Sequence, residues 1–267
     1  MAEMKIEHLS FNYTPQTPIL QDISLTLDTT PTAIIGQNGA GKTTFVKLLK
    51  GLLKPTSGEI KLDGKSIRAL SAPNLAAQIG LVFQNPNDQI FKNKVIDEVM
   101  FGPLNIGMSK EQAKKKALEV LQWLGLEDKI NDNPYDLGLS ERKLIALASV
   151  LAMDTQVVIL DEPTIAHDYA SKEKIKLTIK KLQEQGKMVL TIIHDMDFVA
   201  ECFDRAIVLV KGKILIDGPT EEVFSKEAVL KEAYLEAPHV TQLCRCLGYK
   251  QTYLTVEAFV KAQKGIE

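Results

Sequence analysis

The chain of 267 residues is long enough for one large α/β domain or two small ones, and its 45% hydrophobic and 25% charged residues are ordinary for a soluble globular protein. Its formal net charge of −2 argues against a general nucleic-acid binder, because such proteins carry a basic excess. The apolar runs are too short to cross a membrane, and the start, MAEMKIEHLSF, has no basic-then-apolar signal pattern. We therefore expect a cytoplasmic chain that reaches any membrane only through partners.

Strand patterns recur along the chain and alternate with helical ones, which predicts an α/β fold with a mostly parallel sheet covered by helices. The run ISLTLD at residues 23–28 alternates apolar and polar side chains, which favours an antiparallel strand with one wet face. Three consecutively apolar runs predict buried strands: TAIIG at 32–36, VVILDEP at 157–163 and MVLTIIHD at 188–195. The run AIVLVKGKILIDG at 206–218 predicts a hairpin that turns at Lys211-Gly212.

Two stretches are predominantly helical. Residues 88–150 are predicted to form a helical insert between two strands of the sheet, and within it SKEQAKKKALEVLQWLGL begins with Ser109 as an N-cap. After Gly218 a helical tail runs to the end and closes with LTVEAFVKAQK. These patterns divide the chain into a main domain over residues 1–218 and a C-terminal extension over 219–267.

A phosphate-binding loop is the strongest signal in the sequence. GQNGAGKTT fits the pattern G-x-x-x-x-G-K-[ST], follows an apolar strand and opens a helix, which is the context that the pattern requires. Backbone N–H groups of such a loop surround phosphate oxygens, while Lys42 reaches the β- and γ-phosphates and Thr43 binds Mg²⁺. The predicted ATP-binding residues of this loop are Gly36, Gln37, Asn38, Gly39, Ala40, Gly41, Lys42, Thr43 and Thr44.

Two consecutive carboxylates end the strand VVILDEP. Asp161 is placed to hold the hydration shell of Mg²⁺, and Glu162 is placed to orient and polarise an attacking water. The segment NKVID at 93–97 is one residue too long for a guanine-reading motif and follows no strand, so ATP is the expected nucleotide.

At this point the chain resembles the nucleotide-binding subunits of ATP-binding-cassette (ABC) proteins, which have a P-loop NTPase core with an antiparallel β subdomain. Four further segments fit that family in order: FNY, LVFQNP, IAHD and TIIHD. The resemblance implies that Tyr13 stacks on adenine and that Gln84 senses Mg²⁺ and the attacking water. It also implies that Asp168 crosses to a partner subunit and that His194 contacts the γ-phosphate.

A narrower resemblance covers FQNPNDQIFKNKVIDEVMFGPLNIGMS and the tail segments GPTEEVF, LEAPHVTQL and LTVEAFVKAQK. These are similar to the ATPase subunits of energy-coupling factor transporters, which take up vitamins and transition metals. The resemblance implies a place on the cytoplasmic face of the cell membrane, below a transmembrane coupling protein and a separate substrate-binding membrane protein. Asp88, Gln89, Ile90 and Phe91 are the expected lining of the groove that receives the coupling protein, and the tail is expected to dimerise or regulate.

One motif departs from the family pattern. Each family member offers an L-S-G-G-Q segment to the nucleotide of its partner, and its serine usually lies about 23 residues before the Mg²⁺-binding aspartate. That interval falls on Gly138, so the motif reads Leu137-Gly138-Leu139-Ser140-Glu141. Aligning Ser140 with the family serine instead would delete two residues from a helix and rotate its packing face. In a third interpretation, Ser140 caps the helix and donates to phosphate.

We interpret the signature as degenerate, because Leu139 limits close approach and Glu141 places negative charge where phosphate should arrive. The expected partner is therefore a second ABC ATPase with an intact signature, in a heterodimer with unequal sites. We expect no nucleic-acid partner. Two alternatives are a soluble cassette ATPase acting on DNA or ribosomes and a regulatory subunit that binds nucleotide without hydrolysing it. The transported substrate is not encoded in this chain.

Overall fold

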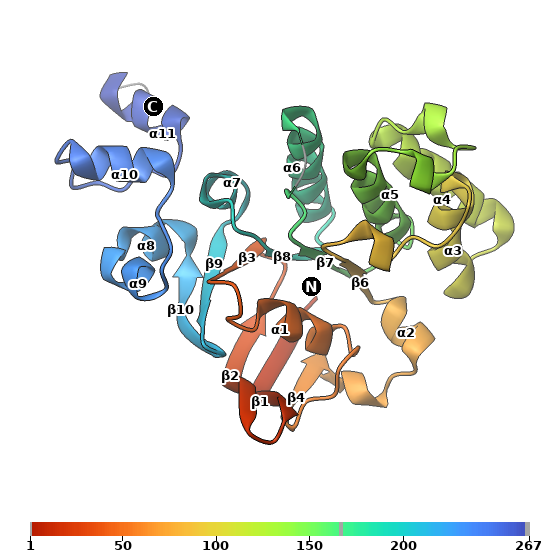
Figure 1. The fold of residues 1–267 in the computed structure, drawn as a ribbon, viewed down its shortest axis with the longest axis horizontal. Helices are drawn as coiled ribbons and strands as arrows, with labels where there is room; N and C mark the ends of the chain where they lie inside the picture. The colour runs from red at the N-terminus through yellow and green to blue at the C-terminus, as the bar shows by residue number, and fades with distance from the viewer. Residues whose placement is uncertain (1, 166–167, 265–267) are drawn as a thin grey trace.

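The computed structural model describes residues 2–165 and 168–264, which form two sheets flanked by helices (Figure 1). The larger sheet has the order β10-β9-β3-β8-β7-β6. Five of its strands are parallel, and β10 pairs antiparallel to β9. The strands are β3 (Thr32–Ile35), β6 (Ile79–Val82), β7 (Val157–Asp161), β8 (Met188–Ile192), β9 (Arg205–Val210) and β10 (Lys213–Pro219). The predicted α/β class and the hairpin at Lys211-Gly212 are confirmed.

A smaller antiparallel sheet has the order β2-β1-β4-β5. It consists of β1 (Met4–Thr14), β2 (Thr17–Leu27), β4 (Ser57–Leu62) and β5 (Lys65–Ser66). The predicted alternation is present in β2, where Ile23 and Leu27 are buried while Ser24 and Thr26 are exposed. One face of this sheet therefore packs on the core and the other meets solvent.

The helices cover the larger sheet and extend beyond both of its ends (Figure 1). They are α1 (Lys42–Leu49), α2 (Ala72–Ala76), α3 (Val95–Asn105), α4 (Lys110–Trp123), α5 (Leu139–Leu151), α6 (Tyr169–Glu184), α7 (Met196–Cys202), α8 (Thr220–Ser225), α9 (Glu227–Glu232), α10 (His239–Cys246) and α11 (Val256–Lys264). Ser109 caps α4 as predicted, because its hydroxyl accepts the Gln112 N–H. The helices α3, α4 and α5 lie at one end of the molecule, and α8–α11 lie at the other.

The core has two main layers, one on each face of the larger sheet. Along β7, Val158 and Leu160 pack toward the layer of α3–α6, whereas Val157 and Ile159 pack toward α1 and the smaller sheet. A strand buried on both faces reads as a continuous apolar run, which is why β3, β7 and β8 could be found from sequence. Within residues 2–165 and 168–264, no helix combines the length and apolarity needed to cross a bilayer.

Candidate nucleotide site

The phosphate loop connects β3 to α1 and requires glycine at two tight positions. Gly36 has φ 152°, and a Cβ there would lie 2.2 Å from the backbone oxygen of Leu209. Gly41 has φ 102° and is the N-cap of α1, where a Cβ would lie 2.8 Å from Leu20 Cδ2. The first turn of α1 contains no acidic residue, and among the described residues no side chain caps it. Its first backbone N–H groups are therefore open to an anion.

Lys42 is held inside this loop. Its side chain is buried, and Nζ donates to the backbone oxygens of Gly36 at 2.7 Å and Gln37 at 2.9 Å. Burial lowers the pKa of Lys42, while the charges of Glu162 and Asp161 act in the opposite direction. The ammonium group thus already lies where phosphate oxygens would enter the loop.

Asp161 lies at the carboxyl end of β7 and is 4% exposed. Burial raises the pKa of its carboxyl group, opposed by the Thr43 side chain and nearby lysines. Its Oδ1 atom is buried and has no hydrogen-bond partner among the described residues. An unpartnered carboxylate oxygen next to Thr43 matches the oxygen ligands that Mg²⁺ prefers, so these residues fit the predicted metal site.

Glu162 is also 4% exposed, and burial raises its pKa to about 7. Its Oε1 lies 2.9 Å from His194 Nε2. The second oxygen, Oε2, is buried without a hydrogen-bond partner in the described part of the chain. Burial also lowers the pKa of His194, with Lys42 contributing in the same direction. A carboxylate that titrates near neutrality, with one oxygen free, can accept a proton from water.

Lys42, Glu162 and His194 line one open cavity of about 360 Å³, whereas Asp161 and Gly36 are not part of its lining. The predicted residues around it are Asn38, Gly39, Gly41, Lys42, Thr43, Thr44, Gln84, Glu162 and His194. Tyr13 is 60% exposed, and its hydroxyl lies 3.5 Å from Thr44 Oγ1, so its ring is near the cavity on the smaller sheet. Ala40 is buried and does not line the cavity, and Gln37 contributes its backbone oxygen to Lys42.

The predicted partner-facing residues lie away from this cavity. Gly138 is the N-cap of α5, which begins at Leu139. Glu141 Oε2 accepts the Gly138 N–H at 3.0 Å. Ser140 lies inside the helix, where its hydroxyl donates to Ser171 Oγ at 2.9 Å, and it therefore does not cap α5. Asp168 caps α6 through the Ser171 N–H, and the predicted loop residues Ala166 and His167 lie outside the described residues.

Two of the four residues predicted to line a coupling groove lie at a cavity. Gln89 and Phe91 line a cavity of about 420 Å³ together with Phe101 and Glu98. Gln89 donates to Ala146 O at 2.7 Å, which ties the segment after β6 to α5. Ile90 is 2% exposed and packs in the core, and Asp88 is exposed outside this cavity.

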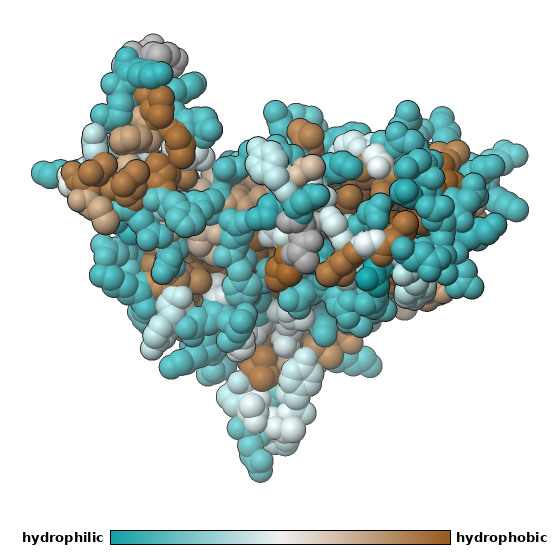
Figure 2. All heavy atoms as spheres, turned by 45° about the horizontal axis from the view of Figure 1, so that its top comes forward, coloured by the Kyte–Doolittle hydropathy of each residue, from teal (hydrophilic) through white to brown (hydrophobic). Residues whose placement is uncertain are grey.

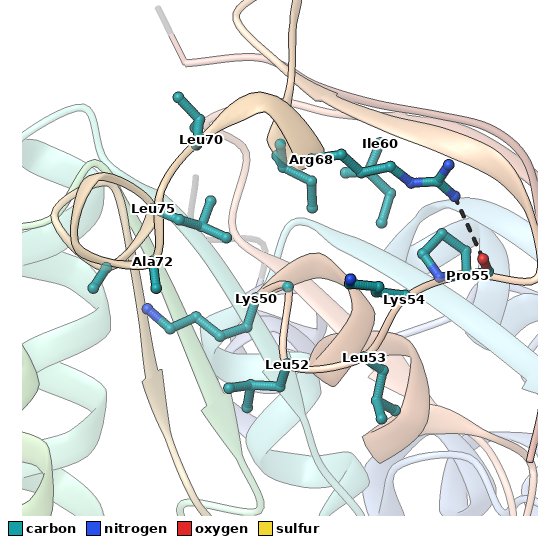
Figure 3. A pocket seen from close by; sticks show the side chains of 13 residues that line it. Lys50, Leu52, Leu53, Lys54, Pro55, Ile60, Arg68, Leu70, Ala72 and Leu75 are labelled. Carbon is teal, nitrogen blue, oxygen red and sulfur yellow. Dashed lines mark hydrogen bonds between the residues drawn. The ribbon is translucent and has the colours of Figure 1, made fainter.

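A larger cavity, of about 630 Å³, adjoins this groove and was not predicted. The two share Lys50, Ala72 and Ala76. Figure 3 shows Leu52 and Leu53 on one side of the cavity and Leu70 and Leu75 on another. Its residues come from the end of α1, from β4 and from α2, and no continuous motif joins these segments.

Known proteins of similar sequence include ABC ATPases. The family model described as ABC transporter matches residues 20–165. A putative ABC transporter ATP-binding protein of Pyrococcus furiosus is 37% identical over 92% of this chain and 94% of its own length. The energy-coupling factor transporter ATP-binding protein EcfA2 of Streptococcus thermophilus is 36% identical over 97% of this chain and 98% of its own length.

Solved structures with a similar fold also include ATP-binding cassettes. The structure of cbiO1 from Clostridium perfringens, described as part of the ABC transporter complex cbiONQ, is similar with a TM-score of 0.76 and 32% identity. That similarity covers 91% of this chain and 98% of cbiO1. The dimeric ATP-binding cassette MJ0796, bound to ADP and Pi after hydrolysis, has a TM-score of 0.74 and 28% identity over 81% of this chain and 98% of its own.

Proposed function

The chain belongs to the ABC transporter family, and from that premise we propose that it is the ATP-hydrolysing subunit of an energy-coupling factor type uptake transporter. The observation that carries the proposal is the cavity in which Lys42, Glu162 and His194 meet at the start of α1. Full-length similarity to EcfA2 supports the narrower assignment, because it includes the C-terminal extension.

In the proposed reaction, the open end of α1 binds the β- and γ-phosphates of ATP, and Lys42 exchanges its backbone acceptors for phosphate oxygens. Glu162 orients the attacking water and accepts its proton on the free Oε2, while His194 fixes Oε1. Thr43 and Asp161 would hold Mg²⁺, which neutralises charge on the transferring phosphoryl group. Gln84, which lines the same cavity, lies on the segment that leads to the groove.

We propose that the active form is a heterodimer with unequal sites. This chain supplies a complete set of catalytic side chains, whereas the start of α5 presents Leu139 and Glu141 to the nucleotide of the partner. A partner with an intact signature would complete the hydrolytic site of this chain. The partner's own nucleotide would face the degenerate signature and be hydrolysed slowly. Two copies of this chain would face two such helices and hydrolyse ATP slowly.

The transmembrane coupling protein is proposed to dock in the hollow formed by the two adjoining cavities on either side of Lys50, Ala72 and Ala76. Through that protein, the chain would lie on the cytoplasmic face of the membrane, and a further membrane protein would bind the vitamin or metal ion.

The C-terminal extension is proposed to join the two ATPase subunits. Figure 2 shows apolar surface gathered over the C-terminal helices, and the exposed apolar residues there include Leu243, Leu247, Val256 and Val260. Exposed apolar patches of this kind commonly mark protein contacts.

The decisive experiment is reconstitution of this chain with a second cassette ATPase that has an intact signature, a transmembrane coupling protein and a substrate-binding membrane protein. We expect membrane proteins to co-purify and ATP turnover to rise at least tenfold over the chain alone. Glu162→Gln should stop most turnover, and the matching change in the partner should stop little. Equal turnover by the isolated chain, or equal effects of the two changes, would contradict the heterodimer. Co-purification with nucleic acid would contradict the transport function.

A further inference from the structure

A buried lysine contacts the backbone of Glu162. Lys143, in the second turn of α5, is 8% exposed, and its Nζ lies 3.3 Å from the backbone oxygen of Glu162. Burial lowers the pKa of Lys143, and the charges of Glu162 and Asp161 oppose that shift. Lysine is almost never fully buried without a partner, so its place at this point requires a reason.

The residue that it contacts has an unusual backbone. Glu162 has φ 52°, in the left-handed region that side chains larger than glycine rarely adopt. Its N–H donates to Ile192 O at 3.0 Å, and its carbonyl accepts from Lys143. Both peptide groups of Glu162 are therefore tied, one to β8 and the other to α5. This backbone conformation aims the carboxylate at His194, 2.9 Å away.

The same helix also contacts the start of α6. One turn before Lys143, the Ser140 hydroxyl donates to Ser171 Oγ at 2.9 Å. The first turn of α5 is the part that faces the partner's nucleotide in the proposed dimer. A shift of this turn would therefore reach the Glu162 carbonyl through the Lys143 side chain, within one rigid helix.

We infer that Lys143 is a positioning residue, which holds the backbone of Glu162 in its left-handed conformation and connects the partner-facing helix to this chain's own hydrolytic centre. The inference rests on the proposed ATPase function. It assigns Lys143 no contact with nucleotide or water. Its effect should consequently fall on the rate of the chemical step and leave ATP binding unchanged.

The test uses the reconstituted complex and three variants. Lys143→Met keeps the apolar stem but removes the donor, Lys143→Gln is too short to reach the carbonyl, and Lys143→Arg keeps a donor. We expect Lys143→Met and Lys143→Gln to lower kcat at least tenfold with KM for ATP changed less than twofold, and Lys143→Arg to keep most of the rate. Lys174→Met is the matched control, because Lys174 Nζ also donates to a backbone oxygen, that of Leu124 at 2.7 Å, away from the cavity.

A double-variant cycle separates positioning from general destabilisation. In a Glu162→Gln background, adding Lys143→Met should lower the residual rate less than twofold, because both changes act through the same side chain. Unchanged kcat in the Lys143→Met and Lys143→Gln variants would overturn the inference, as would a parallel loss of ATP binding and thermal stability in both. If Glu162→Gln itself left turnover intact, the proposed ATPase function would be wrong. That outcome differs from one in which only the role of Lys143 is wrong.

Discussion

Two helix N-termini in this molecule, those of α1 and α5, each follow a glycine but differ in the backbone of that glycine and in the charge of the first turn. The first turn of α1 follows Gly41 and has no acidic residue, so its N–H groups remain available to phosphate. The first turn of α5 follows Gly138 and carries Glu141, whose carboxylate accepts the Gly138 N–H at 3.0 Å. An N-terminus that binds its own carboxylate already has the anion that its dipole favours. A glycine before a helix therefore does not by itself leave the first N–H groups open to an anion.

The largest expected effect concerns Glu162, which lines the same cavity as the first turn of α1. Glu162→Gln removes the proton acceptor, so turnover at this chain's site should fall about 100-fold or more while ATP binding persists. Single-turnover hydrolysis in the heterodimer, with ATP binding measured in parallel, checks both the loss of turnover and the retained binding. A variant that loses binding together with turnover would show that Glu162 acts mainly on nucleotide affinity.

A matched pair of substitutions tests the two N-caps directly. Gly41→Ala forces an L residue to φ 102° against Leu20, at a cost of roughly 1–2 kcal/mol or more, and should weaken ATP binding about tenfold. Gly138→Ala needs only φ −64°, and its Cβ would meet nothing nearer than 3.5 Å, so affinity should not change. Calorimetric titration of the isolated chain with ATP measures both. Equal affinities in the two variants would mean that the open N-terminus of α1 is not the phosphate site.

Removing the carboxylate at the N-terminus of α5 should raise turnover of the partner's nucleotide by a smaller factor. Glu141→Gln removes a charge worth about 0.3–1 kcal/mol near a helix end, so turnover of the partner's nucleotide should rise about two- to fivefold. The measurement uses a heterodimer in which this chain carries Glu162→Gln, so that only the partner's site turns over. Glu111→Gln, in the exposed first turn of α4, is the control. A lower rate after Glu141→Gln would show that this carboxylate assists the partner's site.

The last expected effect is on stability, not on turnover, and it depends on pH. The folded-state pKa of Glu162 is raised from 4.5 to about 7 by burial, so charging it opposes folding. This cost is absent below pH 4.5, grows as the pH rises and is complete above pH 7, where it amounts to about 3 kcal/mol. Glu162→Gln should therefore raise Tm by several degrees at pH 8 and by less at pH 5.5. Thermal unfolding of the nucleotide-free chain at both values checks the sign, and an equal shift at both would refute the assigned pKa.

Much of the fold followed from sequence because its signals are local. The strands β3, β7 and β8 are buried on both faces and read as continuous apolar runs. The groove was harder, since Ile90 lies among residues that reach the surface yet packs in the core. A periodicity argument cannot settle the orientation of four residues in a turn.

The sequence was enough to predict the phosphate loop and the paired carboxylates Asp161 and Glu162, because each depends on contiguous residues. The register that puts Gly138 in the signature position stays a prediction. Only the tertiary structure decided that Lys143 reaches the Glu162 carbonyl 19 residues away and that cavities join around Lys50. A buried contact between distant segments depends on how helices pack on a sheet, and no local pattern encodes that geometry. The candidate catalytic residues could be predicted from the sequence, whereas the contacts that hold them in place depend on the packing.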